Sequence, residues 1–208
     1  MTILEGKVGY SSYSYGSPAP IALAKNGSVV TRDDFTEAVM RGRVFAACNQ
    51  TGVTTQAGLS ATTPVLTLYN PASSGTLGRL WFTDIDFLVA FAAAAQVWLA
   101  LNNDATASAV TGTAATTKNL KMAGSTGAQG NKLSCFTAAT LPAAPVGLFL
   151  LGVGLTGAIS TVPTSLAMSK AYGGSVLIMP NTALSFQTST ASGTNSALAG
   201  FTWEEEDL

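Results

Sequence analysis

The sequence predicts an all-β protein, an antiparallel jelly-roll-like sandwich with an extended N-terminal arm. Short apolar runs recur along most of the 208 residues, and clusters of Gly, Pro, Asn and Ser separate them. Several runs alternate between apolar and polar residues, which is the period of a strand, and helical periodicity is almost absent. Eight strands fit a chain of this length as a jelly roll. We expect residues 1–40 to form the arm and residues 41–208 to form one sandwich domain.

The N-terminal segment carries no periodic pattern. Tyr10, Tyr13 and Tyr15 alternate with serines and precede two prolines, a composition typical of a segment that needs a partner to become ordered. At its end, residues 31–34 form a capping sequence followed by apolar residues, which predicts one short helix closed by Gly42. An extended conformation is the alternative for this stretch.

From Val44 onward the pattern alternates strand and turn. A β-rich run at 65–69 precedes the turn cluster 70–75, and an alternating run then covers 77–91. In that run one predicted face is apolar and the other is mixed. The apolar face consists of Leu77, Trp81, Ile85, Phe87, Val89 and Phe91, and the mixed face of Leu80, Phe82, Asp84, Asp86 and Leu88.

Residues 87–101 allow two interpretations. The alanines within 91–95 have high helix propensity, so this segment could form one apolar helix. We favour two strands with a turn near Ala93, because apolar residues alternate again after it. The Gly-, Ala- and Thr-rich residues 105–132 are predicted to form a loop. Further strands are predicted at 132–138, 146–151, 175–179, 183–190 and 197–204.

Large aromatic residues mark the predicted core. They alternate with small apolar residues instead of standing beside polar partners, so we interpret them as core anchors and not as a stacking platform for sugars or bases. The uncharged run 142–159 is interpreted as a buried strand and not as a membrane span, because prolines and glycines interrupt it. The predicted core anchors are Trp81, Phe87, Trp98, Phe201 and Trp203.

Charge is scarce and balanced. Only 10% of residues are charged, with 10 basic and 11 acidic side chains, and histidine is absent. No basic surface is available to neutralise phosphates or anionic lipids, so we expect neither nucleic acid nor membrane as a partner. Without histidine, the commonest general base and metal ligand is missing, and we assign no catalytic, cofactor-binding or metal-binding residue. Cys48 and Cys135 are interpreted as reduced thiols, and residues 1–15 lack the apolar stretch of a signal peptide, so we expect synthesis in the cytosol.

The few charges are unevenly spread. Residues 44–78, 133–169 and 171–203 carry none, whereas a monomer of this size normally scatters Lys and Glu over its surface. We therefore expect other subunits to cover much of this neutral surface. The acidic run 204–207 is interpreted as a solvated tail, with a metal site or a docking peptide as the alternative.

Two local patterns invite a chemical interpretation. Gly152, Gly154 and Gly157 form a GxGxxG motif, but the residues that follow are β-branched and end in a proline, unlike the helix of a dinucleotide-binding unit. Asp84 and Asp86 share one predicted strand face. They are interpreted as exposed or interfacial polar residues, with acid–base or cation chemistry as the alternative.

Four stretches carry a resemblance to a known group of proteins. They are Arg41-Gly-Arg-Val-Phe-Ala-Ala47 leading to Asn49-Gln50, Leu68-Tyr-Asn-Pro-Ala-Ser-Ser-Gly75, Gly174-Ser-Val-Leu-Ile-Met-Pro180, and the closing Phe201-Thr-Trp-Glu-Glu205. Taken in this order, they resemble the small β-sandwich head decoration or head-fibre-type proteins of tailed bacteriophages. The resemblance spans most of residues 41–205, and none of its motifs is catalytic.

The resemblance implies a non-enzymatic virion protein that forms a homotrimer and binds the major capsid protein on the phage head surface. Made in the host cytoplasm, it would act as a capsid decoration, or cement, protein. Alternatives are a tail-side adaptor or fibre, a major shell protein, and a carbohydrate-binding or cell-attachment module. Tyrosine gives a large contact area at low rotamer cost. The candidate contacts with the shell or a neighbouring subunit are therefore Tyr10, Tyr13, Tyr15 and Phe35.

Overall fold

The computed structural model describes residues 33–89, 91–102, 110–121, 130–154 and 167–208. Residues 38–208 form one compact unit, and all the strands belong to it.

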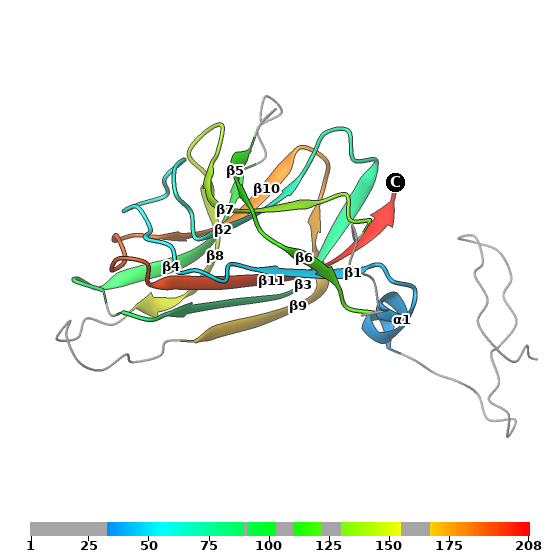
Figure 1. Ribbon diagram of the computed structural model, residues 1–208, viewed down its shortest axis with the longest axis horizontal. Coiled ribbons are helices and arrows are strands. Elements are labelled where there is room, and N and C mark those ends of the chain that lie inside the picture. Colours follow the sequence, from blue (N-terminus) through cyan, green and yellow to red (C-terminus); the bar gives the residue numbers. More distant parts are fainter. Residues whose placement is uncertain (1–32, 90, 103–109, 122–129, 155–166) are drawn as a thin grey trace, which may run out of the picture. The chain divides into compact units, whose positions relative to one another are not determined.

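Two antiparallel sheets form a sandwich, which confirms the fold class predicted from the alternating apolar runs (Figure 1). The five-stranded sheet has the order β6-β1-β11-β3-β9, and the six-stranded sheet has the order β5-β7-β2-β10-β4-β8. The strands are β1 (Val44–Cys48), β2 (Leu66–Asn70), β3 (Thr76–Phe87), β4 (Ala95–Asn102), β5 (Thr111–Ala114), β6 (Thr117–Asn119), β7 (Ser134–Thr140), β8 (Val146–Gly154), β9 (Met168–Ile178), β10 (Thr182–Thr188) and β11 (Ala197–Asp207).

The connections give the winding of a jelly roll. Strands β1, β11, β3 and β9 form one four-stranded layer, and β2, β10, β4 and β8 form the other. The chain changes layer at every step from β1 to β4 and again from β8 to β11, so its first and last strands become neighbours. Strands β5 to β7 are inserted between β4 and β8 and extend both sheets on the side of β1 and β2.

The insertion contains two strands where the sequence predicts a loop. Strands β5 and β6 consist of small or polar residues, and β5 is exposed along its whole length. They pair through their backbones with β7 and β1 and contribute little to the core, so they lack an apolar pattern. Nearby, the two-strand interpretation of residues 87–101 is confirmed and the helical one is wrong, because β3 ends at Phe87 and β4 begins at Ala95.

In β3 the predicted alternation holds only after a bulge at Trp81. Leu80 pairs with Trp203 and the register resumes at Phe82, so Trp81 has no partner on β11. Before this extra residue the even-numbered positions are buried, and after it the odd-numbered ones are. Leu80 is therefore fully buried, whereas Leu77, which the simple alternation assigns to the apolar face, is half-buried.

Aromatic contacts fill the space between the sheets. The rings of Phe186 and Phe201 stack with their centroids 4.6 Å apart, and those of Phe45 and Trp203 lie 6.1 Å apart. Phe87 belongs to the same cluster of buried side chains. The core thus joins β1 and β11 of one sheet to β10 of the other.

Two of the predicted core anchors lie outside this cluster. Trp81 is buried, but its indole N–H donates a hydrogen bond to Glu204 at 3.3 Å. Trp98 is only half-buried, and its ring lies over Gly147 of the edge strand β8, where a Cβ would be 3.0 Å from it. The bulge in β3 takes Trp81 out of the phase of its strand. Trp98 lies between the fully buried Val97 and Leu99, so alternation itself puts its side chain on the opposite face of β4.

The predicted short helix is present as α1 (Asp34–Met40), so the extended alternative is wrong. Asp33 caps its N-terminus, since the carboxylate accepts hydrogen bonds from the backbone N–H of Thr36 at 2.8 Å and from its hydroxyl at 2.7 Å. Gly42 closes the helix with a φ of 74°, and its N–H donates to the Val39 carbonyl.

We expect Trp203→Ala to lower the free energy of unfolding by about 3–5 kcal/mol, because it empties a fully buried position in the core. Thr202→Ala is the matched control: this neighbour on β11 is half-buried on the other face, and a change within about 0.5 kcal/mol is expected. Denaturant titration followed by circular dichroism measures both. Equal, small losses would contradict the assigned register.

Candidate functional site

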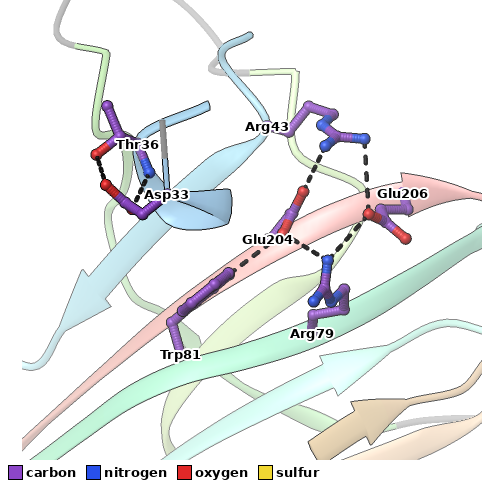
Figure 2. A network of polar contacts seen from close by, with 7 residues as sticks. All are labelled: Asp33, Thr36, Arg43, Arg79, Trp81, Glu204 and Glu206. Atoms are coloured by element: carbon purple, nitrogen blue, oxygen red, sulfur yellow. Dashed lines mark hydrogen bonds and ion pairs between the residues drawn. The ribbon is translucent and has the colours of Figure 1, made fainter. Parts of the chain in front are cut away.

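Two arginines and two glutamates form a cluster across the neighbouring strands β1, β11 and β3 (Figure 2). Arg43 Nη2 lies 2.7 Å from Glu204 Oε1, and Arg79 Nη1 lies 3.4 Å from Glu204 Oε2. The same two arginines reach Glu206 Oε1, at 3.6 Å and 3.3 Å. The guanidinium groups therefore neutralise both carboxylates and connect three strands through side chains.

Glu204 is the buried member of this cluster. Its side chain has no exposed surface, and the Trp81 indole donates to it because the bulge in β3 places the indole beside it. Burial disfavours the charged carboxylate and raises the pKa of Glu204, although Arg43, the Trp81 indole and Arg79 act in the opposite direction. The cluster thus contains a carboxyl group that is easier to protonate than one in water.

Glycine in the adjacent strand makes room for Arg79. The guanidinium carbon lies 5.6 Å from the centroid of the Trp81 ring, a cation–π distance. On β9, Gly174 has a φ of 74°, and a Cβ at this position would lie 2.9 Å from Nη2 of Arg79. A larger residue at position 174 would be strained and would displace the guanidinium group.

Glu205 binds on the opposite side of β11. Its carboxylate accepts hydrogen bonds from the backbone N–H groups of Lys132 at 2.7 Å and Leu133 at 3.0 Å, and from the Trp203 indole at 2.9 Å. It therefore fixes the segment that leads into β7 of the other sheet.

The acidic run is thus not a solvated tail, because Glu204 and Glu205 are both buried within β11. The alternation that begins at Ala197 puts Glu205 on the buried face, and this is the signal that could have identified it. Glu204 is out of phase with that alternation, so no local pattern marks its burial. Nor does the acidic run form a metal site in the described part of the chain. Within the described ranges, no three His, Cys, Asp or Glu side chains form a group that could hold a metal ion.

The stretches that carry the phage-protein resemblance meet around this cluster. Arg43 of the first stretch pairs with Glu204 of the last. Asn70 of the second stretch is fully buried, and its Nδ2 donates hydrogen bonds to the carbonyls of Thr76 and Ile178, both at 2.8 Å. Ile178 belongs to the third stretch, so the buried amide ties the turn after β2 to the end of β9.

A groove of about 340 Å³ is lined by residues of β1, β3, β9 and β11. It brings Asp84 and Asp86 together, and both lie within a mostly apolar lining. Asp84 is exposed and accepts a hydrogen bond from the Ser169 hydroxyl, while Asp86 accepts one from the backbone N–H of Phe87 at 2.7 Å. Asp84 is thus an exposed polar residue, whereas Asp86 is half-buried, and whether either lies at an interface stays a prediction.

The predicted contact residues are described only in part. Tyr10, Tyr13 and Tyr15 lie outside the described residues. Phe35 is in α1 and is half-buried.

The glycines of the GxGxxG motif and the two cysteines lie in strands where the structure describes them. Gly152 and Gly154 belong to β8, and Gly157 lies outside the described residues. Cys48 and Cys135 are free thiols, the first exposed on β1 and the second buried in β7, where burial raises the pKa of its thiol.

Large exposed apolar side chains line the edge strand β8 of one sheet, and two more stand at the end of the edge strand β9 of the other. Sequence analysis missed this feature, because the run 142–159 is interpreted as buried. Clustered exposure of this kind marks interaction surfaces in soluble proteins. The group comprises Val146, Leu148, Leu150 and Val153 of β8 together with Leu177 and Met179 at the end of β9, whereas Met40, Leu88 and Leu208 are exposed singly.

Neither a membrane span nor a known relative accounts for this surface. In the part of the chain that the structure describes, no helix is long and apolar enough to cross a membrane. No protein-family model, curated protein or solved structure matches the chain. The candidate surfaces are therefore interpreted from their own geometry.

Glu204→Gln should change the pH dependence of stability in a defined direction. Because the pKa of Glu204 is raised on folding, the folded protein binds a proton at this site more tightly than the unfolded chain. The native protein should therefore gain stability relative to Glu204→Gln as the pH falls from 7 toward 4. Urea unfolding of both proteins across this range measures the difference. A difference that stays constant, or that moves the other way, would show that the ion pairs outweigh burial.

Proposed function

We propose that this protein is a non-enzymatic structural component of a tailed-phage virion, a decoration protein that assembles as a trimer and binds the outer surface of the head shell. The observation that carries this proposal is the exposed apolar side chains along β8, with two more at the end of β9. It lies in the stretches 133–169 and 171–203, which carry no charge. Surfaces of this composition suit permanent contacts between subunits.

The architecture supports the same proposal. Jelly rolls recur in viral capsid proteins and in lectins, so the fold alone leaves both classes open. The residues that resemble head decoration proteins favour the capsid role, because Asn70 bonds to Ile178 and Arg43 pairs with Glu204, so the stretches contact one another in pairs within the fold. A resemblance confined to loops would carry less weight.

The polar framework gives such a subunit its stiffness. Glu204 holds β1, β11 and β3 together through two arginines, and Glu205 binds the segment before β7. A sandwich held in this way keeps its shape while its outer surfaces make contacts. A decoration protein works by fitting and bracing the shell, so rigidity and surface composition are the properties it needs.

Binding to phage heads tests the proposal directly. Purified protein is mixed with heads that lack this component, and the pellet after sedimentation is quantified against heads that already carry it. We expect saturable binding with a copy number that follows the lattice positions of the shell. Binding to tails only would support the adaptor or fibre alternative. Binding on a glycan array without binding to heads would support the cell-attachment alternative, and either outcome would overturn the proposal.

We expect a homotrimer in solution. Multi-angle light scattering at micromolar concentration should give three times the 21.1 kDa mass of the chain. A monomer mass that persists at the highest concentration would contradict the trimer.

Deleting residues 1–32 should abolish attachment to heads and leave the sandwich intact. The deletion removes the candidate contacts Tyr10, Tyr13 and Tyr15 but retains α1 with its Asp33 cap. Thermal unfolding should be almost unchanged, while co-sedimentation with heads should be lost. A full-length variant with the three tyrosines changed to serine is the matched control for chain length, and it should also fail to bind. Binding of the truncated protein at the native stoichiometry would place the attachment surface on the sandwich.

A further inference from the structure

We propose that the exposed side of β8 is the surface through which this chain packs against further copies of itself. We call Val146, Leu148, Leu150 and Val153 the β8 surface. The inference rests on the trimer of the proposed function and identifies the strand that builds it.

Strand β8 differs from the other three edge strands of the sandwich. Strands β5 and β6 are only 4 and 3 residues long, and β6 carries Lys118. Strand β9 carries Lys170 and is interrupted by the Gly173-Gly174 bulge. Short length, lysine and bulges are the devices that protect sheet edges from unwanted association. Strand β8 has 9 residues and no charge, and of these devices it has only bulges, in its pairing with β4.

The β8 surface is apolar over its whole length. Val146 is 71% exposed and Leu150 is 47% exposed. Trp98 of β4 pairs with Leu150 and is itself half-buried, so an aromatic ring borders the same surface. On the other side of the strand, Phe149 packs against the core. An edge strand that is apolar on both sides leaves one side in water unless another chain covers it.

Side chains, and not the backbone, are suited to make this contact. The pairing of β8 with β4 shifts register twice, so Leu148 and Leu151 have no partner on β4. These bulges interrupt the regular row of N–H and C=O groups that an added strand would need. The strand therefore resists extension into a continuous sheet but still presents its leucines and valines. Where such packing closes around a symmetry axis, it gives an assembly of fixed size.

A second copy of the chain is the occupant that fits this surface. Residues 133–169 contain no charged residue, so a charged partner would lose hydration there without gaining an ion pair. Apolar surfaces of this kind are typical of obligate interfaces, in which the subunits associate as they are made. The partner present from synthesis, at equal concentration and with the same apolar surface, is another copy. A head shell meets the protein only after assembly, when an uncovered β8 surface would already have aggregated.

Leu150→Asp tests the inference, with Leu88→Asp as the matched control. Leu88 is 50% exposed, follows the end of β3 and is not one of the residues of the β8 surface. In sedimentation equilibrium, the native protein and Leu88→Asp should remain trimeric, while Leu150→Asp should dissociate at concentrations at least about 100-fold higher, since a charge would enter an apolar contact. A trimer of unchanged affinity in Leu150→Asp would overturn the inference.

A second variant keeps the test decisive if Leu150→Asp fails to fold. Leu150→Cys is placed in a Cys48→Ser background, because Cys48 is exposed and Cys135 is buried. A short bismaleimide should then link subunits covalently, and Leu88→Cys in the same background should not be linked. Absence of linked Leu150→Cys chains would overturn the inference.

The outcomes separate this inference from the proposed function. If no substitution in the β8 surface weakens the trimer, the inference is overturned and the prediction of head binding is unaffected. Native protein that does not bind heads, but whose trimer is lost in Leu150→Asp, overturns the proposed function and supports the inference. A native monomer that binds heads overturns the inference and the trimer of the proposed function, and supports head binding.

Discussion

The burial of two consecutive carboxylates in the last strand is the constraint on which the sandwich depends. Strand β11 lies between β1 and β3, and its alternation sends Glu204 toward the arginines and Glu205 toward the other sheet. Burying a carboxylate costs several kcal/mol unless charges and hydrogen bonds compensate for it. Arg43, Arg79 and the Trp81 indole compensate for Glu204, and backbone N–H groups compensate for Glu205. Strands β1, β11 and β3 are thereby held together through their side chains.

The sequence was sufficient to predict the sandwich and most of its strands, because alternation reports which face of a strand is buried. It did not predict the bulge at Trp81, since that depends on how β3 pairs with β11 and β9. Nor did it predict the burial of Glu204, whose partners Arg43 and Arg79 lie more than 100 residues away in the chain. Strands β5 and β6 were missed because backbone pairing alone forms them.

The candidate surface was harder to predict than the fold. An uncharged apolar run predicts a buried strand, and β8 is such a strand on the side of Phe149. Its other side is exposed because β8 is an edge strand of its sheet. The position of a strand within a sheet cannot be predicted from a local sequence pattern. The sequence did indicate, through the charge-free stretches, that other subunits cover part of the molecule. In our proposal, that expectation applies to the side chains of the β8 surface, and Leu150 is the residue chosen to test it.

The central claim is that a rigid jelly roll uses its surface, and not a reactive site, to brace a phage head. A cryo-electron microscopy reconstruction of the particle that contains this chain tests it most directly. The account predicts jelly-roll density in groups of three on the outer surface of the head, with the β8 strands facing one another around each threefold axis. Density for this chain in the tail, or single subunits with β8 directed into solvent, would contradict it.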